Sequence, residues 1–118
     1  MTIKPQGKGG TQHQYLQNLV KRMGQQRGYH SVIGTPVFGG LGAVDVSLVR
    51  FGKKVAVEVS VNTQFKWEAS NISKCLSAGF DHVIVLSSDN LHLANLRKLV
   101  NLEYSDNMKK CAGFFYHR

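Results

Sequence analysis

The sequence predicts a single α/β domain in which helices flank a mixed β-sheet. Two Val-rich segments, at 43–51 and 54–61, are separated by a glycine turn and are typical of an antiparallel hairpin. A third apolar run, at 81–87, follows a segment with helical periodicity, as expected for a buried strand that joins a sheet in parallel. The 118 residues are enough for one domain with its own core.

The segment before the hairpin predicts an arm, a helix and a strand. Residues 1–10 are polar, basic and glycine-rich, which is typical of a flexible arm in front of a domain at 11–118. A first helix is expected over 11–27, with Thr11 as N-cap and Gln14 completing a capping box. Its apolar stripe contains Tyr15, Leu16, Leu19, Val20 and Met23. Gly28 ends this helix, and a strand is expected at 29–37.

Two more helices and a last strand are expected after the hairpin. The second helix is placed at 67–78 and ends before Gly79. The third begins at a cap formed by Asp89 or Asn90 and runs to about residue 102. The run at 111–116 predicts a final edge strand, and its aromatic residues also suggest a surface for a homodimer.

The hairpin places two acidic residues in apolar surroundings. With Gly52 first in a type II′ turn, Phe51 lies opposite Lys54 and Ser47 lies opposite Glu58. Strand alternation then puts Asp45 and Glu58 on one sheet face, with their Cβ atoms about 7 Å apart. Two carboxylates this close repel each other, and a divalent cation such as magnesium would compensate. The alternative is a solvated sheet face that carries two unrelated acids.

The charge distribution favours a polyanionic partner. The formal net charge is +8, from fifteen basic and seven acidic residues. No acid precedes Asp45, and the cations before it are candidates for phosphate contacts: Lys4, Lys8, Lys21, Arg22 and Arg27. Nucleic acid, with DNA as the first choice, is therefore the expected partner. The alternative is a basic surface without a partner.

The remaining composition argues against several other classes. The two cysteines, Cys75 and Cys111, lack the spacing of a metal site and favour a reduced, cytoplasmic protein. No apolar run is long enough for a membrane span, and the N-terminus does not resemble a signal peptide. His13 and His30 are the histidines nearest the two acids in the expected fold, but no pair has zinc-site spacing and a catalytic histidine is not expected.

The same residues resemble a nuclease family. The order helix, strand, hairpin, helix, strand, with Asp45 in one hairpin strand and Glu58 in the next, resembles the PD-(D/E)XK nuclease superfamily. The stretch VDVSL…VAVEVSVNT…NISKCLSAGFDHVIVLS is also similar to a bacterial subgroup with Glu-x-Ser in place of Glu-x-Lys. The resemblance covers about 11–99. It implies a restriction endonuclease-like core in which Asp45 and Glu58 bind catalytic magnesium or manganese, joined in our reading by the backbone carbonyl of Val59.

This chain departs from the family pattern at one position. Ser60 stands where the motif has its lysine. The resemblance implies that the lysine has moved to the next helix, where Lys74 stands, with Asn71 one turn earlier to hold water or a phosphate oxygen. It also implies that Gln12 takes the place of a first-helix glutamate that points at the metal.

The sequence supports three functional hypotheses. The first is a magnesium-dependent phosphodiesterase, a nuclease, acting on DNA. The second is a nuclease-fold module that binds DNA without cutting it, which the serine at position 60 favours. The third is a small protein-interaction domain whose partner docks on the aromatic C-terminal segment. Only the first predicts cleavage, and the first two predict salt-dependent DNA binding.

Overall fold

The computed structural model describes residues 10–37, 42–60, 65–103 and 112–116. Within them lie three helices and five strands, and the expected order of elements is confirmed. The elements are α1 (Thr11–Gln26), β1 (His30–Val37), β2 (Gly42–Arg50), β3 (Lys53–Val59), α2 (Phe65–Ser77), β4 (His82–Ser87), α3 (Asn90–Glu103) and β5 (Ala112–Tyr116).

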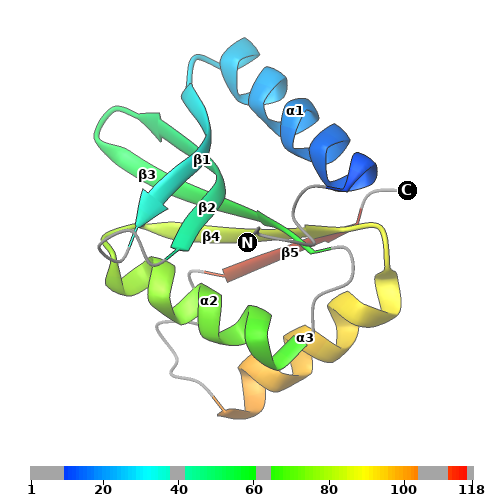
Figure 1. The fold of residues 1–118 in the computed structure, drawn as a ribbon. Coiled ribbons are helices and arrows are strands. Elements are labelled where there is room, and N and C mark those ends of the chain that lie inside the picture. The colour runs from blue at the N-terminus through cyan, green and yellow to red at the C-terminus, as the bar shows by residue number, and fades with distance from the viewer. Residues whose placement is uncertain (1–9, 38–41, 61–64, 104–111, 117–118) are drawn as a thin grey trace.

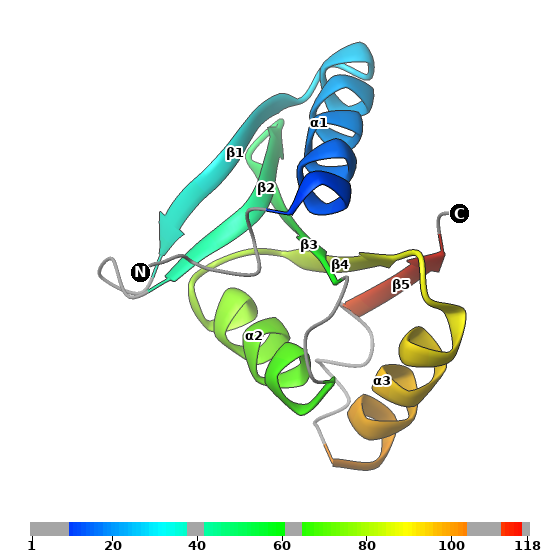
Figure 2. The ribbon, with the colours of Figure 1, turned by 45° about the vertical axis from the view of Figure 1, so that its right-hand side comes forward.

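The described strands form one mixed sheet in the order β1-β2-β3-β4-β5. The β1, β2 and β3 strands pair antiparallel, whereas β3, β4 and β5 pair parallel. The α1 helix covers one face of the sheet, and α2 and α3 lie on the other (Figures 1 and 2). The α/β class, the mixed sheet and the flanking helices are therefore as the sequence predicts. No helix in the described ranges has both the length and the hydropathy of a membrane span.

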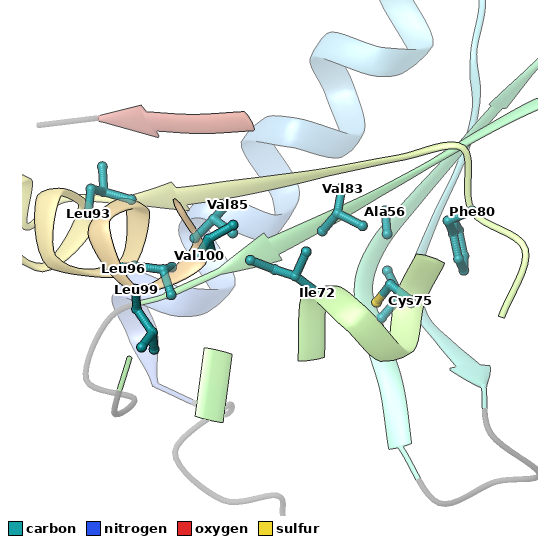
Figure 3. Packing of buried hydrophobic residues seen from close by; sticks show 11 residues of the cluster. Ala56, Ile72, Cys75, Phe80, Val83, Val85, Leu93, Leu96, Leu99 and Val100 are labelled. Atoms are coloured by element: carbon teal, nitrogen blue, oxygen red, sulfur yellow. The ribbon is translucent and has the colours of Figure 1, made fainter. Parts of the chain in front are cut away.

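The main core fills the space between the sheet and the α2–α3 pair (Figure 3). In both helices the apolar residues recur about every 3.6 residues, so they form one face, and this face packs against the sheet. The buried cluster consists of Val44, Ala56, Ile72, Cys75, Phe80, Val83, Val85, Leu93, Leu96, Leu99 and Val100. Asp89 accepts a hydrogen bond from the backbone N–H of His92 at 3.0 Å, which confirms it as the cap of α3.

The α1 helix is rotated relative to the expected stripe. Tyr15 and Met23 are exposed, and the buried residues are His13, Leu16 and Gly24. The shift follows from Gly24, because a Cβ atom there would lie 2.6 Å from Ser31 Oγ. A glycine in the contact lets the helix approach the sheet closely, which a count of large apolar residues does not detect. The N-cap is Gly10 without a side-chain bond, so the predicted Thr11 capping box is wrong.

The hairpin register differs from the expected one by two residues. Arg50 pairs with Lys53, so the two loop residues are Phe51 and Gly52. Both have positive φ, +52° and +76°, which defines a type I′ turn rather than the predicted type II′ turn. Positive φ is unfavourable for phenylalanine, and the Arg50 guanidinium stacks on its ring at 4.8 Å. Because the shift is even, the alternation of faces is preserved near the turn.

Candidate active site

Asp45 lies at a strand break, the point where the β2–β3 ladder ends although β2 itself continues to Gly42. The β2–β3 ladder ends at the pair Val46–Val57, beyond which the strands separate (Figure 2). Val44 packs in the α2–α3 core cluster, whereas Leu48 packs against Gly24 of α1, so the regular alternation of faces changes between these two residues. The Asp45 carboxylate instead accepts a hydrogen bond from the backbone N–H of Val59, with Oδ2 at 2.8 Å. It thus bridges the two strands where their ladder stops.

Glu58 makes the reciprocal contact from the β3 strand. Its Oε2 accepts a hydrogen bond from the backbone N–H of Asp45 at 3.3 Å. The other oxygen, Oε1, lies 3.7 Å from Cys75 Sγ of α2. Both carboxylates are only 4% exposed. The observed register would place these acids directly opposite each other instead of diagonally.

The expectation of one polar sheet face holding both acids is wrong in its geometry. Asp45 reaches into the gap between the strands and is contacted from α1, whereas Glu58 is contacted from α2. Ser47 does lie on the face of Glu58, because it pairs with Ala56 of the α2–α3 core, and its hydroxyl oxygen lies 2.8 Å from that of Thr35 on β1. The cause is the change of faces along β2 where its ladder with β3 ends, because strand alternation assigns faces only while the pleat is regular.

His13, which the sequence placed near the two acids but without a role, contacts Asp45. Its Nε2 lies 3.2 Å from Asp45 Oδ1, and its side chain is 4% exposed. Neither ring nitrogen makes a hydrogen bond to the described residues. One turn later, Gln17 Nε2 lies 3.4 Å from the same oxygen. A signal was available, since His13, Leu16, Val20 and Gly24 follow helical spacing, but neither histidine nor glycine counts as apolar in a stripe.

Gln12 does not occupy the place expected for it. It is exposed, and its Nε2 donates a hydrogen bond to Ser88 Oγ at 2.6 Å, just beyond the end of β4. The side chain that reaches Asp45 from the first helix is that of His13, the next residue. The discrepancy is one helical position, or about 100° of rotation, and has the same cause as the rotated stripe of α1.

Ser60, at the motif-lysine position, is fully buried. Its backbone N–H bonds the carbonyl of Leu86 at 2.8 Å, which continues the pairing with β4. Its Oγ lies 2.7 Å from Nε2 of His92, on the first turn of α3. No sequence pattern connects these two residues, which are 32 positions apart. The serine is therefore held between β3 and α3, two residues after Glu58.

The two α2 residues expected at the site lie beside the thiol that touches Glu58. Asn71 is half-buried and precedes Cys75 by four residues, so both lie on one side of the helix. Lys74 is exposed, in the last turn of α2, next to Cys75 in the chain. Its position allows an ammonium on a flexible stem to extend towards the site.

Three of the five proposed phosphate-binding cations lie among the described residues, on α1 or at its C-cap. Lys4 and Lys8 lie outside the described residues. Lys21 is half-buried and follows Gln17 by one helical turn, on the side of α1 that faces Asp45. Arg22 is exposed to solvent. Arg27 lies at the opposite end of α1 from His13, about 20 Å along the helix axis at 1.5 Å per residue.

The donors at the strand break suit a hard divalent cation. The Asp45 and Glu58 carboxylates both lie at this point, and carboxylate oxygens are ligands that magnesium prefers. Across the described ranges, no three His, Cys, Asp or Glu side chains are grouped to bind a metal. An ion here would thus need main-chain or water oxygens as well, which is how proteins commonly hold magnesium.

Comparison with known proteins identifies a fold neighbour. No protein-family model matches the chain, and no curated protein matches it. A solved structure, the crystal structure of protein of unknown function AF1548, is similar with a TM-score of 0.54 at 14% sequence identity. The match covers 85% of this chain and 55% of that one, so this chain spans little more than half of its neighbour's length. The likeness concerns the fold alone.

Proposed function

We propose that this protein is a magnesium-dependent phosphodiesterase of the PD-(D/E)XK type that acts on DNA. The observation that carries the proposal is the reciprocal arrangement of Asp45 and Glu58 at the strand break. Each buried carboxylate accepts a backbone N–H from the other's strand, at 2.8 and 3.3 Å. Burying two acids side by side is costly, and an ion between them would offset much of that cost.

The side chains around the break have distinct roles in this proposal. Asp45, Glu58 and the carbonyl of Val59 would hold the ion, which supplies an activated water and stabilises charge on the phosphate. His13 and Gln17 hold the Asp45 carboxylate from the α1 side. Lys74 would extend from α2 to the attacking water or to a non-bridging oxygen, where negative charge grows in the transition state.

The test is cleavage of DNA and RNA substrates in magnesium or manganese. Plasmid, single-stranded and branched DNA should be compared, because the geometry of the site does not distinguish duplex, single-stranded and branched substrates. Asp45→Asn and Glu58→Gln should abolish cleavage with little change in shape. Asp81→Asn is the matched control, because this acid accepts the N–H of Lys54 at the other end of β3. If this control loses activity together with the two site variants, the assignment of the site is refuted.

A second candidate is a DNA-binding module that has lost catalysis. The observation that favours it is Ser60, which is fully buried and bonded to His92 where the motif requires a lysine. This candidate predicts salt-dependent DNA binding without cleavage in either metal. Binding without cleavage would reject the first candidate, and absence of both activities would reject the two together.

A further inference from the structure

An apolar groove lies on the α1 face of the sheet. The α1 helix contacts β1, β2 and β3, whereas the opposite face carries both α2 and α3 (Figures 1 and 2). The groove has a volume of about 400 Å³. Val57, Ile84 and Leu86 belong to its floor, Met23 and Arg27 line it from the α1 side, and β5 contributes Phe115 and Tyr116. One face of the sheet is thus covered by two helices and the other by one.

Large apolar side chains are exposed along this groove. Phe115 is 54% exposed, Tyr116 is 49% exposed and Met23 is 43% exposed. These three side chains come from elements at opposite ends of the described sequence, and they meet only around the groove. Exposed apolar side chains that gather at a concave surface indicate a binding site more than scattered ones do.

The dimensions suit one face of a short helix. An engineered cavity of about 150 Å³ takes up one benzene molecule, so about 400 Å³ accommodates two or three large side chains. An amphipathic helix presents that number at positions i, i+3 or i+4, and i+7. A helix in this place would lie beside α1 and complete the second layer of the sheet.

The positive charge around the groove favours an acidic partner over a second copy of this chain. Arg27 is its one charged lining residue within the described part of the chain, and the adjoining α1 helix contains Lys21 and Arg22 but no acid. A second copy of this chain, with its net charge of +8, would bring like charges together. A partner with acidic residues beside its apolar ones would be attracted.

We propose that this groove binds an amphipathic helix of a partner protein that carries acidic residues along the edge of its apolar face. The proposal does not depend on nuclease activity, because the groove is formed by residues other than Asp45 and Glu58.

The test uses two synthetic peptides of about 16 residues, close to the length at which an isolated helix becomes stable. Both carry leucines at i, i+4 and i+7; one has glutamates beside them and the other has lysines. Binding is measured by fluorescence anisotropy, and the bound surface is mapped by methyl NMR. We expect the acidic peptide to bind at least about tenfold more tightly, which corresponds to about 1.4 kcal/mol. It should shift the methyl signals of Val57, Ile84 and Leu86.

Variants of exposed residues keep the test separate from folding. Phe115→Ala and Arg27→Glu should each weaken the acidic peptide about tenfold, as truncating a central contact residue does in other interfaces. Leu91→Ala is the control, because Leu91 is 70% exposed on α3, away from the groove. Equal affinity for both peptides, or signal shifts elsewhere, would overturn the proposal. A stable dimer, or binding to anionic vesicles, that Phe115→Ala abolishes would also overturn it, by assigning the groove to another occupant.

Discussion

Divalent cations should stabilise this protein through Asp45 and Glu58. If the two carboxylates are about 6 Å apart, in an effective dielectric constant near 20, their repulsion is about 3 kcal/mol. The hydrogen bonds at 2.8 and 3.3 Å offset part of it. A cation that binds between the acids removes the remainder and binds the folded state selectively.

The size of the effect follows from linkage. At a free-ion concentration ten times the dissociation constant, stabilisation is RT ln 11, or about 1.4 kcal/mol. A domain of 118 residues has an unfolding entropy of about 0.25 kcal/mol/K near its midpoint. The melting temperature should therefore rise by about 6 °C. Thermal denaturation followed by circular dichroism, in EDTA and in manganese or magnesium, measures this shift.

Glu58→Gln is the decisive variant for this prediction. Glutamine keeps an oxygen that can accept the N–H of Asp45 but removes one negative charge. We expect this variant to lose the cation-induced rise of about 6 °C. Its melting temperature in EDTA should equal or exceed that of the wild type in EDTA, because one of the two repelling charges is gone. Asp81→Asn should retain the full rise. If Glu58→Gln keeps the cation-induced rise, the ion binds elsewhere and the reasoning is wrong.

Three further predictions concern catalysis, binding and packing. Lys74→Ala should lower the cleavage rate about 10²–10³-fold, as loss of one charge-stabilising group does elsewhere, while DNA affinity by gel shift changes little; full activity in this variant would exclude a role for Lys74. Lys21→Ala should reduce the slope of log K against log salt by about 0.9 if the lysine contacts one phosphate, and an unchanged slope would remove it from the interface. Gly24→Ala should lower the melting temperature, because a Cβ would lie 2.6 Å from Ser31 Oγ and overpacking costs about 1–3 kcal/mol; Gln25→Ala, at an exposed position of the same helix, is the control.

The elements could be predicted from the sequence because each has a strong local signal. Helix ends at Gly28 and Gly79, the cap at Asp89, and the continuous apolar run of β4 depend on residues close together in the chain. These signals were enough to give the order of elements and the mixed sheet. The turn was less predictable, because Phe51 adopts a positive φ that its own chemistry disfavours.

The arrangement around the acids could be predicted only in part. Asp45 and Glu58 were found as neighbours because an even register shift keeps both residues near each other across the hairpin. His13 was placed near the acids, but its contact with Asp45 was not predicted, because it depends on the close packing of α1 that Gly24 permits. The contact between Ser60 and His92 joins residues from β3 and α3, and no local pattern connects two elements so far apart in the chain.

Asp45 has a structural role at the strand break that is independent of any reaction. Its side chain accepts the Val59 N–H where a carbonyl of a neighbouring strand would otherwise do so. A lineage that abandoned DNA cleavage would still be under selection to keep this acid, because losing it leaves a buried donor unsatisfied. In an evolutionary comparison, retention of Asp45 is therefore a poor indicator of catalysis. Under the proposed function, retention of Lys74 is the more informative character for separating active descendants from inactive ones.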